Sequence, residues 1–72
     1  MGKVIEHVFE EAGKPDEWLR GTVTGVVKGK KEIAEGLTRN VRYREKDNDG
    51  FDGVFAHRLT PDREGRYWRL VK

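Results

Sequence analysis

The residues of this chain that are best suited to chemistry are aromatic. Seven are present, namely Phe9, Trp18, Tyr43, Phe51, Phe55, Tyr67 and Trp68. Phe9 and Trp18 flank an acidic segment interrupted by Gly13 and Pro15, and such a pair serves either as core or as one side of a pocket. Ring faces attract quaternary ammonium ions by ~0.5–1 kcal/mol when exposed and about 2 kcal/mol when desolvated. The aromatic residues therefore suggest two alternatives, a hydrophobic core or a cation-binding pocket.

Residues suited to other chemistry are few. The sequence has no Ser, Cys or Gln, and its two histidines, His7 and His57, occupy predicted strands, where a structural role is commoner than a catalytic one. The acidic segment 45–49 opens with the spacing of a calcium loop, but Ala56 occupies the twelfth position, where a bidentate carboxylate is required. We therefore expect no enzyme activity, no metal site and no cofactor.

The composition is that of one small domain covering residues 1–72. A chain of this length buries only about 60% of the surface that its unfolded form exposes. Charged residues make up 39% and apolar residues 35%, and there is no cysteine, so we expect a thin core without disulfides. No apolar run approaches the ~20 residues of a membrane span, and no basic-then-apolar leader is present. These features predict a soluble intracellular protein.

Five short β-strands are predicted from runs of β-branched and aromatic residues. They cover residues 4–9, 18–27, 41–44, 54–59 and 67–71. Turn-forming residues separate them at 12–15, 47–53 and 60–62, and the polar segment 28–36 is either a helical turn at 32–35 or an extension of a hairpin. Short strands with almost no helix predict a small all-β, SH3-like barrel of four to five antiparallel strands.

The predicted strand order brings four aromatic residues to one end of the barrel. In an up-and-down meander, the loops after the first and third strands lie at the same end. Four aromatic residues adjoin these loops: Phe9, Trp18, Tyr43 and Phe55. They form a candidate aromatic cage for a quaternary ammonium ion. The alternative is that they cap a thin core, which is the preferred interpretation for Tyr67 and Trp68.

Acidic residues lie beside the candidate cage. The segment between Phe9 and Trp18 contains Glu10, Glu11, Asp16 and Glu17. These carboxylates are expected to form a docking edge that attracts a basic peptide. Three further residues are candidates for the rim: Phe51, Asp52 and His57. Phe51 is also an alternative to Phe55 as a cage residue.

The chain resembles a known family most closely in its first third. Residues 2–11 (GKVIEHVFEE) and 16–23 (DEWLRGTV) are similar to the Tudor-like repeat of the spindlin family (Spin/Ssty repeats), above all to its second repeat. The similarity continues through 41–43, 54–55 and Leu59, and through Asp62 and residues 64–65. It spans nearly the whole chain, and its first third is the most specific part.

This resemblance implies a nuclear reader of methylated lysine on histone tails, with trimethyl-lysine near the N-terminus of histone H3 as ligand. The cage residues of the family correspond to Phe9, Trp18, Tyr43 and Phe55, and the family usually has Tyr at the last of these positions. Two features depart from the family. Its members carry three repeats and this chain carries one, and the segments before and after Tyr43 are longer here, so residues 47–53 adjoin the predicted rim.

Two other functions remain open. The second half of the chain is rich in arginine, with Arg39, Arg42, Arg44, Arg58, Arg63, Arg66 and Arg69. With Tyr43 and Phe55 for base stacking, it suits a nucleic-acid-binding barrel, although the net charge of +2 is small and the acidic edge would repel phosphates. Alternatively, a single repeat self-associates, as a homo-oligomer, through the surface that its sister repeats would cover.

Overall fold

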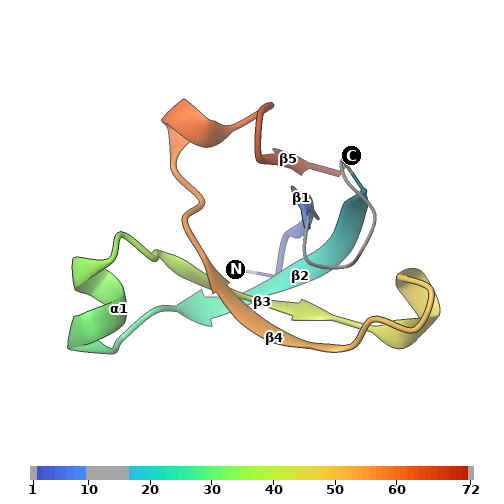
Figure 1. Cartoon of the computed structure of the whole chain (residues 1–72), viewed down its shortest axis with the longest axis horizontal. Coiled ribbons are helices and arrows are strands. Elements are labelled where there is room, and N and C mark those ends of the chain that lie inside the picture. The colour runs from blue at the N-terminus through green and yellow to red at the C-terminus, as the bar shows by residue number, and fades with distance from the viewer. Residues whose placement is uncertain (1, 10–16, 72) are drawn as a thin grey trace.

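A curved antiparallel sheet of five strands forms the domain (Figure 1). The computed structural model describes residues 2–9 and 17–71. The strands are β1 (Val4–Val8), β2 (Trp18–Val26), β3 (Arg39–Tyr43), β4 (Gly53–His57) and β5 (Trp68–Leu70). Their order in the sheet is β4-β3-β2-β1-β5, so the last strand pairs with the first. The predicted small SH3-like β-barrel is confirmed, and each strand lies within three residues of its expected bounds.

Three short helical segments connect the strands. The helix α1 (Lys30–Ala34) joins β2 to β3, η2 (Glu45–Asp47) follows β3, and η3 (Pro61–Arg63) precedes β5. Of the two interpretations of residues 28–36, the helical turn is correct, and it begins two residues earlier than expected. No helix in the described ranges is long and apolar enough to cross a membrane.

The core lies on the inner side of the curved sheet. Because side chains alternate between the two faces of a strand, every second residue of β1, β2 and β3 points inward. The buried cluster consists of Ile5, Phe9, Leu19, Val23, Val41 and Tyr43. Gly21 lies between Ile5 and Tyr43 in the register, and a Cβ there would lie 2.5 Å from a methyl carbon of Val41. Glycine is therefore required at this position by the close approach of β3.

The segment between β3 and β4 is folded back onto β2 by one side chain. Asn48 is 7% exposed, and its Nδ2 donates to the carbonyl oxygens of Arg20 (2.8 Å) and Arg44 (3.0 Å). Its Oδ1 accepts from the backbone N–H of Arg20 at 2.7 Å. The turn that follows has positive φ at Asp49 (52°) and Gly50 (93°). The predicted turn at 47–53 is thus preceded by η2 and fixed to the sheet.

The two aromatic residues near the C-terminus differ in their environment. Trp68 packs against the core, and its Nε1–H donates to the carbonyl oxygen of Thr60 at 3.0 Å. Tyr67 is 38% exposed, and the guanidinium carbon of Arg63 lies 3.9 Å from its ring centroid. The expectation of a core position is therefore wrong for Tyr67, because it lies in the turn before β5, where its ring meets the Arg63 guanidinium at the surface.

Candidate functional site

Three of the four predicted cage residues lie together at one end of the barrel. The ring centroids of Phe9, Tyr43 and Phe55 are 5.1–6.1 Å apart. Phe51 joins them, with its centroid 5.1 Å from Phe9, 5.5 Å from Tyr43 and 5.4 Å from Phe55. We call these four residues the phenyl cluster. Phe51 belongs to it in addition to Phe55 rather than in its place.

Trp18 lies on the opposite face of the sheet. It pairs with Val8 in the register between β1 and β2, one position before the inward-pointing Leu19. The guanidinium carbon of Arg69 lies 4.0 Å from the centroid of its ring. The expectation that Trp18 lines one pocket with Phe9 therefore does not hold in this arrangement. Both residues are at the same end of the barrel, but strand alternation separates their faces.

The phenyl cluster is closed. Tyr43 is fully buried and Phe9 is 8% exposed, whereas Phe55 is 40% exposed and Phe51 is half-buried. The rings of Phe51 and Phe55 are stacked, with 22° between their planes, and the other pairs meet edge to face or tilted. Centroid distances of this size mean direct contact between rings. The rings fill the space that a cage would leave for a ligand.

Two histidines adjoin the phenyl cluster. The rings of His7 and His57 stack with centroids 4.0 Å apart, and Phe9 meets both edge to face. The Oη of Tyr43 and the Nε2 of His57 share a hydrogen bond of 2.7 Å. The Nδ1–H of His7 donates to the carbonyl oxygen of Val8 at 2.8 Å. His57 was expected as a rim residue, but it lies against the buried rings.

Burial keeps both histidines neutral at pH 7. Burial, with a smaller contribution from the neighbouring His7, lowers the pKa of His57 to about 3. Burial also lowers the pKa of His7, with a contribution from the charge of Arg63, and the bond to the Val8 carbonyl opposes this shift. The phenol of Tyr43 stays protonated, because burial raises its pKa. The site beneath the rings is therefore uncharged.

The acidic edge is described only in part. The predicted residues Glu10, Glu11 and Asp16 lie outside the described residues. Glu17 is described, and its carbonyl oxygen accepts a hydrogen bond from the backbone N–H of Phe9 at 3.2 Å. Asp52, a candidate rim residue, forms an ion pair with Arg42 at 3.2 Å. That pair places a carboxylate beside the turn that carries Phe51.

Sequence reasoning missed two parts of this site. The clamp by Asn48 has no local signal, because an asparagine in a polar turn is ordinary. The stacking of His7 on His57 joins β1 to β4, which are not neighbours in the sheet. The sequence offered one signal for this contact, since each histidine lies two residues from a phenylalanine of the phenyl cluster. Among residues 2–9 and 17–71, no group of three or more acidic or histidine side chains could hold a metal ion.

Comparison of the chain with protein-family models, with curated proteins and with solved structures gives no match.

Proposed function

We propose that this chain is a non-catalytic binding module that recognises a trimethyl-lysine side chain of a histone-tail peptide at the phenyl cluster. The observation that carries the proposal is the convergence of four rings, two of them partly exposed, at one end of the barrel. The resemblance of residues 2–11 and 16–23 to spindlin repeats favours the same ligand class. Recognition of this kind uses ring faces and needs no chemical step.

The chemistry of the cluster suits a quaternary ammonium ion. Such an ion keeps its charge but has no N–H group, so aromatic faces replace its water at lower cost than they would for lysine. Because His7 and His57 are neutral, no positive charge beneath the rings opposes the ligand. Asp52 follows Phe51 in the chain and is exposed, so its carboxylate, which pairs with Arg42, can exchange that partner for a cation of a basic peptide.

Binding requires the outer rings to separate. Phe51 and Phe55 stack on each other, and Gly50 and Gly53 on either side of Phe51 have φ values of 93° and 156°. Gly53 pairs with Tyr43 in the sheet, so we expect rotation at Gly50, outside the strands, to move Phe51 away from Phe55 and expose the faces of Phe9 and Tyr43. An aromatic stack is worth ~0.5–1.5 kcal/mol beyond its buried area. The bound ion offsets this cost by contacts of about 2 kcal/mol with each desolvated ring.

The test is a calorimetric titration with a trimethyl-lysine peptide from the N-terminus of histone H3 and with its unmethylated twin. We expect the trimethylated peptide to bind roughly tenfold more tightly or better, consistent with one to two ring contacts. Phe55→Ala should abolish this difference, whereas Phe55→Tyr should retain it. Trp18→Ala is the matched control, because Trp18 lies on the other face. Equal affinities of the two peptides would refute the proposal.

A second candidate function rests on the outer face of the sheet. Arg20, Arg42 and Arg44 line a hollow of about 430 Å³ on β2 and β3. Arg69 extends this row of cations and stacks on Trp18. Trp18 is partly exposed, and arginine beside such an aromatic ring is a common platform for single-stranded nucleic acid. Glu6, which pairs with Arg69 at 2.8 Å and with Arg20 at 3.7 Å, offsets part of the charge.

Salt dependence distinguishes this second candidate from peptide binding. Single-stranded oligonucleotides should bind with an affinity that falls linearly with the logarithm of salt concentration, since phosphate contacts release counterions. Changing Arg42 and Arg44 to Gln should lower that slope, whereas Lys31→Gln on α1 should leave it unchanged. A slope near zero would exclude nucleic-acid binding on this face.

A further inference from the structure

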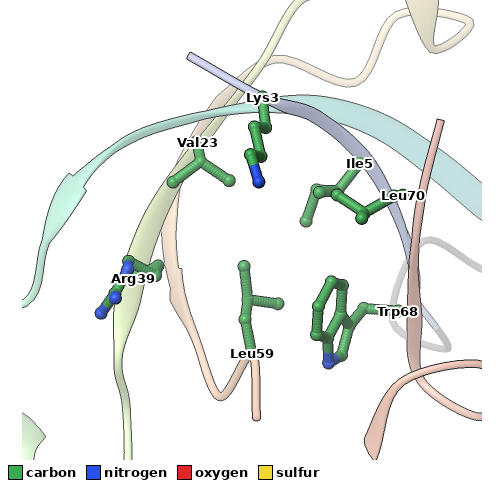
Figure 2. A pocket seen from close by; sticks show the side chains of 7 residues that line it. All are labelled: Lys3, Ile5, Val23, Arg39, Leu59, Trp68 and Leu70. Carbon is green, nitrogen blue, oxygen red and sulfur yellow. The ribbon is translucent and has the colours of Figure 1, made fainter. Parts of the chain in front are cut away.

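A cavity of about 270 Å³ opens into the barrel away from the phenyl cluster (Figure 2). It lies at the first residues of β1 and β3, whereas the phenyl cluster lies at the last residues of the same strands. Its apolar lining consists of Ile5, Val23, Leu59, Trp68 and Leu70. Ile5 and Val23 belong to the buried core, so the hollow reaches the interior of the domain.

Two cations complete the lining, and no acidic side chain of the described residues does. The side chain of Lys3 points into the cavity in Figure 2, with its ammonium directed between Val23 and Ile5. The guanidinium of Arg39 turns outward, and its Nη1 donates to the carbonyl oxygen of Thr38 at 3.0 Å. Within residues 2–9 and 17–71, neither cation forms an ion pair.

An ammonium directed at apolar walls favours an anionic ligand. Lys3 is exposed overall, so its ammonium stays solvated at the open side of the cavity. An anion seated there against the apolar walls is attracted more strongly than it would be in bulk water, because the walls lower the local dielectric. The indole N–H of Trp68 is already bonded to Thr60, so the wall it forms offers ring surface rather than a donor. The cavity therefore combines an apolar interior with a positive charge at its mouth.

We propose that this cavity binds a small monocarboxylate with an aliphatic or aryl body. The apolar body of the ligand packs against Leu59 and Trp68, and its carboxylate pairs with the ammonium of Lys3. The guanidinium of Arg39 can turn inward at the mouth of the cavity to join this pair. The volume lies slightly below the ~300–1,000 Å³ of pockets for drug-sized ligands, which limits the body to a short chain or a single ring. A dianionic phosphate suits the site less, because its second charge would face apolar walls.

The proposal is independent of peptide recognition at the phenyl cluster, and it is tested on the full chain by nuclear magnetic resonance. The indole N–H resonance of Trp68 reports on the cavity, and a Trp18→Phe variant assigns it. Sodium octanoate should shift this resonance saturably, whereas octan-1-ol, which has the same body without the charge, should bind at least tenfold more weakly. Octylammonium should not bind, because Lys3 repels it.

Variants locate the binding of octanoate. Lys3→Gln should weaken it about tenfold, a conservative Lys3→Arg should retain it, and Leu59→Trp should abolish it by filling the cavity. Arg44→Gln removes a cation from the outer face and serves as the matched control. Equal affinity for octanoate and octan-1-ol, or an unchanged affinity in Lys3→Gln, would overturn the proposal. Binding of a peptide with a free C-terminal leucine, without binding of octanoate, would also overturn it.

Discussion

Acid should destabilise the domain through His57. Burial holds the pKa of this ring at about 3 in the folded state, against a usual value of 6.5. Because the folded state resists protonation and the unfolded state does not, the unfolded chain binds the extra proton once the pH falls below 6.5. Stability is therefore complete above pH 6.5 and is lost as the pH falls from 6.5 toward 3.

The expected loss is measurable well above the folded-state pKa. Each pH unit below 6.5 costs about 1.4 kcal/mol as long as the folded ring stays neutral. Between pH 7.5 and pH 5 the free energy of unfolding should thus fall by about 2 kcal/mol through His57 alone. His7 contributes in the same direction, because its pKa is also lowered. In a domain this small, such a loss is a large part of the total stability.

The assay is urea unfolding followed by tryptophan fluorescence at pH 7.5, 6.5, 5.5 and 5. His57→Phe keeps an aromatic ring against His7 but removes the titrating group, so its free energy of unfolding should fall less over the same range. The quantity compared is the change in unfolding free energy between two pH values in each protein. The lost bond to Tyr43 and the titration of carboxylates present in both proteins cancel in this comparison. Equal losses of stability in acid for the two proteins would show that His57 does not cause the effect, as would a measured pKa of His57 near 6.5.

Four further substitutions, one of them a control, test the packing. Asn48→Ala removes three hydrogen bonds to backbone groups and should lower the free energy of unfolding by roughly 2–3 kcal/mol, measured by chemical denaturation; a loss below 0.5 kcal/mol would contradict the clamp. Gly21→Ala places a carbon 2.5 Å from a core valine and should lower the melting temperature by about 10 °C or more. Gly25→Ala, with no atom within 4 Å of the added carbon, should change it little. Tyr43→Phe removes the partner of His57 and should cost about 1 kcal/mol at pH 7.5, which a urea titration would detect.

Local sequence patterns predicted the strands well, because each strand carries its own signal. Alternating β-branched and aromatic residues define β1 and β3, and Gly and Asp residues define the turn before β4. The start of β3 was missed by two residues, since Arg39 and Asn40 have low strand propensity and are held by pairing with β2 and β4. Pairing partners, rather than local preference, determine such bounds.

The candidate site was less predictable, because it depends on register. Phe9, Tyr43 and Phe55 were correctly placed at one end of the barrel, but the face of each ring depends on which residues pair. The pairing of Val8 with Trp18 is set by the register between β1 and β2. A shift of this register by one residue would turn the Trp18 side chain to the inner face. The cavity was not predicted, because its two cations, Lys3 and Arg39, are 36 positions apart in the sequence and form no local cluster of charge.

The pairing of β5 with β1 has a consequence for how the chain folds. The side chains of Glu6 and Arg69, joined across this pair, are 63 residues apart in the sequence. Nearly the entire chain must therefore close into one loop before this contact forms, and loops of that length are entropically costly. We expect β2 and β3 to pair early and β5 to dock last, which predicts folding on the millisecond-to-second scale of β-barrels. During synthesis, one edge of β1 therefore stays unpaired until β5 has been made.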